Sequence, residues 1–243
     1  MTASMSQSAP QFSSTDAARI VSEIDRDGYA AITGFVSEAD LAEAQRFVRD
    51  AVAANGGNYL DFKGAERLEG TFLRSLSGDQ GFLDLCRGIY EHSTGQPAPD
   101  VGFYQVLRCL SGGLARANSL TFHYDSYVLT ALIPIIMPDR GTPGDLLIIP
   151  NTRAVRSSYL GNLVDKVMLD NPLSQGVLRM LYARGSRLIR HVPLVPGTLY
   201  LFYGYRTIHT NEACDPDAIR STALFHFADP HAGSGLKTLL RQR

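Results

Sequence analysis

The sequence predicts a mainly β domain with flanking helices. Stretches rich in β-branched and aromatic residues, which favour strands, recur in the middle and the C-terminal third of the chain, at 120–137, 198–203 and 222–228. Amphipathic patterns that follow capping residues predict helices in the N-terminal third. The chain has 243 residues, 44% of them hydrophobic, which suffices for one sizeable core, so we expect one domain.

The N-terminal third is expected to alternate helices and strands. The stretch from Ser14 to Asp16 is typical of the cap of a helix that runs to about residue 25 and is ended by Gly28. Ser37 and Asp40 have the spacing of a capping box, and an amphipathic pattern follows them to about residue 53. Three further elements are expected here: strands at 29–35 and 102–110, and a helix at 82–94.

Residues 1–14 are polar and lack the charged start and apolar run of a secretory signal, so we expect a disordered tail before one domain at 15–243. The net charge of −1 and the scattered basic residues argue against nucleic acid or a membrane as partners, and no segment has the ~20 apolar residues of a membrane span. The three cysteines show no metal-binding spacing and no even pairing, which indicates reduced thiols and a cytoplasmic protein. Monomer and homodimer both stay open.

Residues 153–190 interrupt the β pattern. Within this insert, helices are expected at 161–168 and 173–184. Long interruptions of a compact domain are often binding loops, so the insert is expected to be a lid over the site.

The most informative motif is Thr121-Phe122-His123-Tyr124-Asp125, at the start of the 120–137 stretch. In an extended strand, side chains two positions apart point to the same face, so His123 and Asp125 can reach one metal ion while Tyr124 points away. Non-haem Fe(II) sites use two imidazoles and one carboxylate on one face of the metal. The motif supplies two of those three ligands.

A second imidazole and a guanidinium follow in order. His209 lies in a short segment after the 198–203 strand, and Arg220 stands 11 residues further on, at the start of the 222–228 strand. Two antiparallel strands that carry His209 and Arg220 would place both side chains over one pocket. The sequence therefore predicts a metal site with a cationic group beside it.

These residues resemble the Fe(II)/2-oxoglutarate-dependent oxygenases, and more narrowly their phytanoyl-CoA dioxygenase-like branch. The family pattern is an HxD pair, a distal His and an Arg about a dozen positions beyond it, matched here by His123, Asp125, His209 and Arg220. Segments 27–52 and 196–213 are also similar to that branch, so the resemblance covers roughly residues 15–230. It implies a double-stranded β-helix, a jelly-roll barrel of two packed sheets with the metal in its mouth.

The resemblance also implies the roles of individual residues. The catalytic metal ligands for Fe(II) would be His123, Asp125 and His209, with 2-oxoglutarate and O2 as co-substrates. Arg220 would pair with the distal carboxylate of 2-oxoglutarate, and Thr222, on the same strand face, would add a hydroxyl. Further candidates for this co-substrate sub-site are Thr130, Tyr104 and Asn211. Candidate substrate contacts are Tyr127, Tyr203, Arg206 and Asn118.

Some residues have a structural interpretation beside the functional one. A solitary His in a β-rich segment is more often a hydrogen-bonded structural residue than a ligand, and the ordered set with Arg220 is what favours the ligand role of His123 and His209. His226, between two phenylalanines on an expected core strand, is expected to be structural. Five arginines are candidates for binding an acidic group of the substrate: Arg108, Arg116, Arg153, Arg190 and Arg206. Each one taken alone is expected to face solvent, and whether any of them contacts the substrate stays open.

The expected activity is oxidation of an unactivated C–H bond of a small molecule, such as an amino acid or a biosynthetic intermediate, with release of succinate and CO2. Asp125 is a carboxylate where related halogenases have Gly or Ala, so hydroxylation or desaturation is favoured over halogenation. Two alternatives stay open: a protein hydroxylase of the same chemistry, and a non-catalytic metal-binding β-barrel. The chain has Asn151 where the family often has a Pro-Gly-Ser-His-like strand end, so the substrate is not assigned by analogy.

Overall fold

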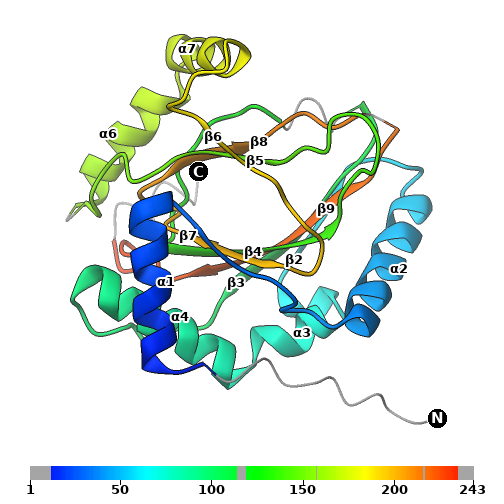
Figure 1. Cartoon of the computed structure of the whole chain (residues 1–243), viewed down its shortest axis with the longest axis horizontal. Coiled ribbons are helices and arrows are strands. Elements are labelled where there is room, and N and C mark those ends of the chain that lie inside the picture. The colour runs from blue at the N-terminus through cyan, green and yellow to red at the C-terminus, as the bar shows by residue number, and fades with distance from the viewer. Residues whose placement is uncertain (1–11, 114–118, 157, 216, 235–243) are drawn as a thin grey trace.

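Two antiparallel sheets face each other and are buttressed by helices (Figure 1). The computed structural model describes residues 12–113, 119–156, 158–215 and 217–234. The larger sheet has six strands in the order β1-β7-β4-β9-β3-β2: Ala30–Ile32, Leu199–Phe202, Leu129–Ile136, Arg220–Phe227, Tyr104–Leu110 and Leu60–Lys63. The smaller sheet has three strands in the order β6-β5-β8: Arg190–Val192, Leu146–Ile149 and Ile208–Asn211. The expected mainly β fold of two packed sheets is confirmed, although the sheets do not close into a barrel.

Four helices cover the outer face of the larger sheet, while the smaller sheet lies on its other side (Figure 1). They are α1, α2, α3 and α4: Ser14–Asp27, Glu38–Ala54, Phe72–Ser77 and Gln80–Thr94, with a short 3-10 helix η1 at Ala65–Arg67. The main hydrophobic core lies between these helices and the sheet. A second, smaller core lies between the two sheets. The site described below shares that inter-sheet space.

Local capping chemistry sets the helix ends. Ser13, one residue before the expected cap, caps α1 through a reciprocal capping box with Asp16, and Gly28 ends the helix with a φ of 84°, which favours glycine. Ser37 caps α2 as expected, since its side chain accepts a hydrogen bond from the Asp40 backbone N–H. Among the described residues, no helix is both long and apolar enough to cross a bilayer.

The 153–190 segment contributes two helices beside the smaller sheet, α6 (Tyr159–Asp170) and α7 (Pro172–Ala183) (Figure 1). Arg153 ties α6 to the body: its guanidinium donates to Tyr205 O at 2.7 Å, and to Asp165 and Asn162 at 3.0 Å each. The guanidinium also lies over the Tyr124 ring. The outer sides of the two helices expose several large apolar side chains: Leu160, Val164, Val167, Met168, Leu173, Val177 and Met180.

Gln175 of α7 holds the chain immediately before His123. Its side-chain amide accepts a hydrogen bond from Phe122 N at 3.0 Å and donates to Phe122 O at 2.8 Å. Both Gln175 and Phe122 are buried. The insert therefore braces the backbone that presents the HxD motif.

Replacing Gln175 with leucine is expected to destabilise the protein by roughly 2 to 5 kcal/mol, because the buried Phe122 N–H and C=O would both lose their partner. Urea unfolding of the metal-free protein measures this loss. Val177→Ala, on the exposed side of the same helix, is the matched control and should change stability little. A Gln175→Leu variant as stable as the control would show that the brace contributes nothing.

Candidate metal centre and co-substrate pocket

The HxD segment is extended but forms only one bridge pair instead of the expected strand. His123 and His209 exchange backbone hydrogen bonds, each N–H donating to the other residue's carbonyl at 3.0 Å. The regular strand β4 begins only at Leu129. This pairing places the two imidazole rings side by side, with centroids 4.4 Å apart.

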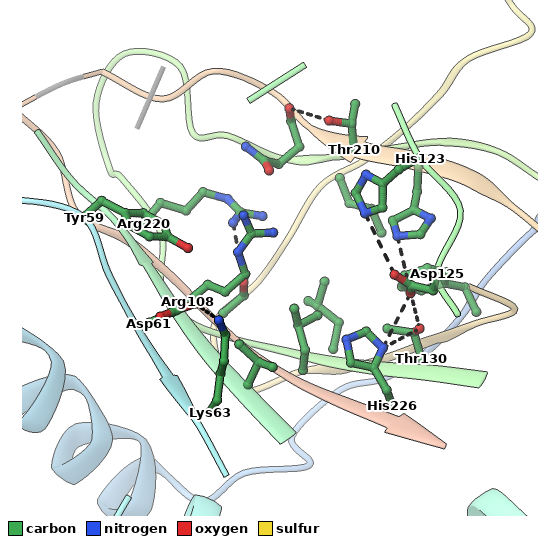
Figure 2. Close-up of a pocket in the computed structure, with 18 residues that line it drawn as sticks. Tyr59, Asp61, Lys63, Arg108, His123, Asp125, Thr130, Thr210, Arg220 and His226 are labelled. Atoms are coloured by element: carbon green, nitrogen blue, oxygen red, sulfur yellow. Dashed lines mark hydrogen bonds and ion pairs between the residues drawn. The ribbon is translucent and has the colours of Figure 1, made fainter. Parts of the chain in front are cut away.

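Three potential ligand groups converge at this point (Figure 2). His209 Nε2 lies 3.4 Å from Asp125 Oδ2, and His123 Nε2 lies 3.9 Å from Asp125 Oδ1. One ligand atom from each of the three residues lies within 4.8 Å of the others. A single ion can therefore contact all three.

The other ring nitrogens fix the tautomer of both imidazoles. His123 Nδ1 lies 2.9 Å from Thr121 O, and His209 Nδ1 lies 3.0 Å from Thr207 O. A carbonyl only accepts, so each Nδ1 carries a proton, and each Nε2 is the nitrogen that faces Asp125 and can bind a metal once it is deprotonated. Metal-binding imidazoles are commonly oriented in this way.

Burial and mutual charge tune the three groups. Burial, with the charge of His209 adding to it, lowers the pKa of His123 to about 4, so this imidazole is neutral at pH 7. Burial would raise the pKa of Asp125, but the neighbouring His209 and His226 outweigh burial and hold that pKa well below its usual value. The carboxylate is therefore ionised. A neutral imidazole beside an ionised carboxylate is the donor chemistry that a divalent ion requires.

Asp125 is held by residues whose roles the sequence did not disclose. Thr130 donates a 2.5 Å hydrogen bond to Asp125 Oδ2, and His226 Nδ1 lies 3.6 Å from the same oxygen. Thr130, a candidate for the co-substrate sub-site, lines the cavity, and its hydroxyl supports the carboxylate. His226 was expected to be structural, yet it lines the same cavity. Both face inward because they form a cross-strand pair on β4 and β9.

Gly204 allows the chain to pass close to Asp125. Its carbonyl accepts a 2.9 Å hydrogen bond from Asp125 N. A Cβ at this position would lie 2.3 Å from Asp125 Oδ2 and 2.4 Å from Thr130 Oγ1. Any larger residue would push the carboxylate away from the imidazoles. The local sequence Gly-Tyr-Arg does not by itself indicate this contact.

Replacing Thr130 with valine is expected to weaken Fe(II) binding by about 10- to 100-fold, the usual effect of losing a partner that orients a metal ligand. Valine keeps the shape of threonine but cannot donate to Asp125. Metal affinity is read by competition with a chromogenic chelator. Thr130→Ser retains the hydroxyl and should bind Fe(II) like the wild type, and equal affinities for the two variants would contradict the assignment.

Arg220 stands at the start of β9, on the opposite side of the cavity from the imidazoles (Figure 2). Only 4% of this residue is exposed. Its Nε donates to Gly144 O at 2.5 Å, and one terminal nitrogen lies 3.5 Å from Thr222 Oγ1. Burial lowers the pKa of the guanidinium to about 10, so it remains charged at pH 7. Among the described residues, none forms an ion pair with it within 4.0 Å.

One cavity of about 280 Å³ joins these groups between the two sheets. Thr222 and Asn211, two candidates for the co-substrate sub-site, line it, and Asn211 also donates to Ser119 Oγ and Glu212 O. Tyr104 and Tyr127 stack on each other and on His226, with the two tyrosine rings 5.6 Å apart, but neither belongs to the cavity wall.

The remaining substrate candidates lie elsewhere. Tyr203 follows β7, where Tyr200 and Phe202 pack between the sheets and alternate residues turn toward the helices, so Tyr203 is buried in the main core. Arg206 lies over the Tyr203 ring and lines a separate cavity. Asn118 lies outside the described residues. Sequence proximity to His209 was misleading for Tyr203 and Arg206, because the backbone turns away between them and the metal site.

A second group of potential ligands, Asp145, His191 and Glu212, lies on the smaller sheet. Its oxygens are already engaged: Tyr182 donates to Glu212 Oε1 at 2.5 Å, and Leu194 N donates to Asp145 Oδ1 at 2.8 Å. His191 Nε2 lies 3.2 Å from Glu212 Oε2 and 3.4 Å from Asp145 Oδ2. None of the three lines the cavity, so the His123 group is the better metal candidate.

Comparison with known proteins identifies the fold. No protein-family model and no curated protein matches the sequence. A prolyl hydroxylase from Trichoplax adhaerens, in complex with a hypoxia inducible factor peptide, is similar with a TM-score of 0.59 and 13% identity over 91% of this chain and 94% of that one. The non-haem α-ketoglutarate-dependent epimerase SnoN from nogalamycin biosynthesis is similar with a TM-score of 0.53 and 15% identity over 89% of this chain and 84% of that one.

A further similar structure is HygX from Streptomyces hygroscopicus with nickel and 2-oxoglutarate bound, with a TM-score of 0.53 and 14% identity over 89% of this chain and 86% of that one. The chain thus has the jelly-roll fold of the non-haem, 2-oxoglutarate-dependent oxygenases. The resemblance drawn from the motifs is confirmed at the level of the fold. The narrower phytanoyl-CoA dioxygenase-like branch is not singled out by these similarities.

Proposed function

We propose that this protein is an Fe(II)- and 2-oxoglutarate-dependent oxygenase that oxidises an unactivated C–H bond of a small molecule. One observation carries the proposal: two imidazole Nε2 atoms and an ionised carboxylate converge on one side of a cavity, and the other side presents a buried guanidinium that pairs with no acidic side chain in the described part of the chain. A divalent metal fits the first set, and a carboxylate fits the second.

His123, Asp125 and His209 would hold the iron through three positions and leave the others open on the cavity side. Thr130 and His226 hold Asp125 in place, and the backbone carbonyls of Thr121 and Thr207 keep both imidazoles in the ligand tautomer. Bound together, iron and 2-oxoglutarate supply the oxidising chemistry, with O2 consumed and succinate and CO2 released.

Arg220 would bind the distal carboxylate of 2-oxoglutarate through two parallel hydrogen bonds, because its planar guanidinium matches a carboxylate at two points. Thr222, on the same face of β9 and 3.5 Å from that guanidinium, would add a hydroxyl donor. Asn211 lines the same region. Because Arg220 and the three metal ligands line the same cavity, one 2-oxoglutarate molecule could contact both.

A small-molecule substrate is supported by the cavity, whose volume of about 280 Å³ lies at the lower end of ligand sites. SnoN, from nogalamycin biosynthesis, has the same fold. The prolyl hydroxylase complexed with a peptide supports the second candidate, a peptide hydroxylase of the same chemistry. A gain of one oxygen on candidate peptides, measured by mass spectrometry, would favour that alternative.

The domain organisation and cellular location complete the proposal. Residues 15–243 would form one oxygenase domain with the 153–190 insert beside its site. In the described residues, no insert side chain lines the cavity, so its action as a lid would require movement from the braced position. Cys86, Cys109 and Cys214 are all buried free thiols, which supports a reducing, cytoplasmic setting.

Anaerobic titration with Fe(II) and 2-oxoglutarate tests the proposed function. A keto acid bound through two oxygens to such an iron should produce a weak visible absorption band near ~500 nm. We expect the band in the wild type and its loss in Asp125→Ala. A wild-type protein that binds Fe(II) without the band would instead be a metal-binding protein of another kind.

A further inference from the structure

A second guanidinium points into the same cavity, and the proposed co-substrate does not require it. Arg108 lies on β3 directly opposite Thr222 of β9, and it lines the cavity together with Arg220 (Figure 2). Arg108 is half-buried, whereas Arg220 is 4% exposed. Arg108 therefore stands nearer the opening of the cavity.

Arg108 lacks an acidic partner in the part of the chain that the structure describes. Asp61 is its cross-strand neighbour on β2, but the Asp61 carboxylate pairs with Lys63 Nζ at 3.3 Å and forms no ion pair with Arg108 within 4.0 Å. Asp145 and Glu212 lie outside the cavity wall and are engaged by His191, Tyr182 and backbone N–H groups. The positive charge of Arg108 is thus left for something that enters the cavity.

The charges of the proposed loaded site balance without Arg108. Fe(II) and the dianion of 2-oxoglutarate cancel, as do Asp125 and Arg220, while both imidazoles bind as neutral ligands. Lys63 and Asp61 cancel each other. The positive charge of Arg108 therefore remains uncompensated. Because Arg108 is half-buried, this charge is partly desolvated, and the binding of an anion beside it is favoured.

We propose that Arg108 is a substrate-anchoring residue and that the substrate is a small organic acid. This inference rests on the proposed function and names its substrate class. Leu132, Phe202 and Leu224 supply apolar wall in the same cavity, which suits the carbon skeleton of such an acid.

The test separates substrate binding from co-substrate binding. Wild type, Arg108→Gln, Arg108→Lys and Arg220→Gln are each titrated anaerobically with Fe(II) and 2-oxoglutarate, and then, by calorimetry, with aliphatic and aromatic monocarboxylic acids paired with their primary amides. Arg49→Gln, an exposed arginine on α2, is the control. We expect the wild type to bind acids at least about tenfold more tightly than their amides, since a charge-assisted pair is lost in the amide.

Arg108→Gln should lose this preference, Arg108→Lys should keep part of it, and both should retain the wild-type affinity for 2-oxoglutarate within about twofold. The inference is overturned if the wild type does not prefer acids, or if the preference survives in Arg108→Gln. It is also overturned if Arg108→Gln weakens 2-oxoglutarate binding as Arg220→Gln does, since Arg108 would then belong to the co-substrate.

The same calorimetric titration in protein without iron distinguishes the two proposals. An acid preference that depends on Arg108 and not on Arg220, in a wild type that never develops the visible band, would reject the oxygenase function and keep the anion subsite. A normal band with no acid preference would keep the oxygenase function and reject the subsite.

Discussion

Replacing Asp125 with alanine is expected to abolish Fe(II)-dependent turnover of 2-oxoglutarate while the protein stays folded. Asp125 is the carboxylate between the two imidazoles, and its oxygens lie 3.4 Å and 3.9 Å from their Nε2 atoms. Its removal leaves two imidazole ligands, so Fe(II) affinity should fall by more than the roughly 10- to 100-fold that follows removal of a residue that only orients a metal ligand. Succinate release and bound iron content measure both effects.

The free energy of unfolding of the metal-free protein is expected to fall by roughly 1 to 3 kcal/mol, because the substitution takes the carboxylate partner away from the buried Thr130 hydroxyl and from His209 Nε2. Urea unfolding checks this. Asp61→Ala is the matched control: its carboxylate lines the same cavity but pairs with Lys63, so iron content should be unchanged. Full iron loading of Asp125→Ala would remove this residue from the ligand set.

Replacing Arg220 with glutamine is expected to raise the Kd for 2-oxoglutarate at least about 100-fold and to leave Fe(II) affinity unchanged. The guanidinium would lose two charge-assisted hydrogen bonds to the distal carboxylate, each worth about 1.5 to 3 kcal/mol. Glutamine retains a donor near Gly144 O, the present partner of Arg220 Nε, which limits the damage to the fold. The amplitude of the visible band against 2-oxoglutarate concentration gives the Kd.

Two comparisons make the Arg220 result specific. Arg220→Lys keeps the charge but not the planar fork, so its Kd should lie between those of the wild type and Arg220→Gln. Arg49→Gln should behave like the wild type, since that side chain is exposed on α2. A wild-type Kd in Arg220→Gln would assign the distal carboxylate to another group, and Arg108 would be the first alternative.

Local sequence signals, such as helix caps and amphipathic patterns, correctly predicted several elements of the fold. The Ser37 cap and its amphipathic pattern correctly predicted α2, and Gly28 correctly predicted the end of α1, because caps and left-handed residues act within one helical turn. The strand expected just before Asp125 was wrong: the segment makes one bridge to His209 and no ladder. Its neighbours across space, Gln175 and Gly204, hold it extended instead.

Residue order and chemistry by themselves determined the fold class and brought His123, Asp125, His209 and Arg220 forward as one set, because ligand type and strand spacing are local properties of the chain. Only the tertiary structure decided what surrounds that set. It shows that Thr130 and His226 contact Asp125 and that Tyr203 packs in the main core. It also shows that Arg108, one of the five candidate arginines, lines the cavity. The physical reason is that these roles depend on which strands pair and which face each residue takes, and pairing joins residues about 100 positions apart that no local pattern relates.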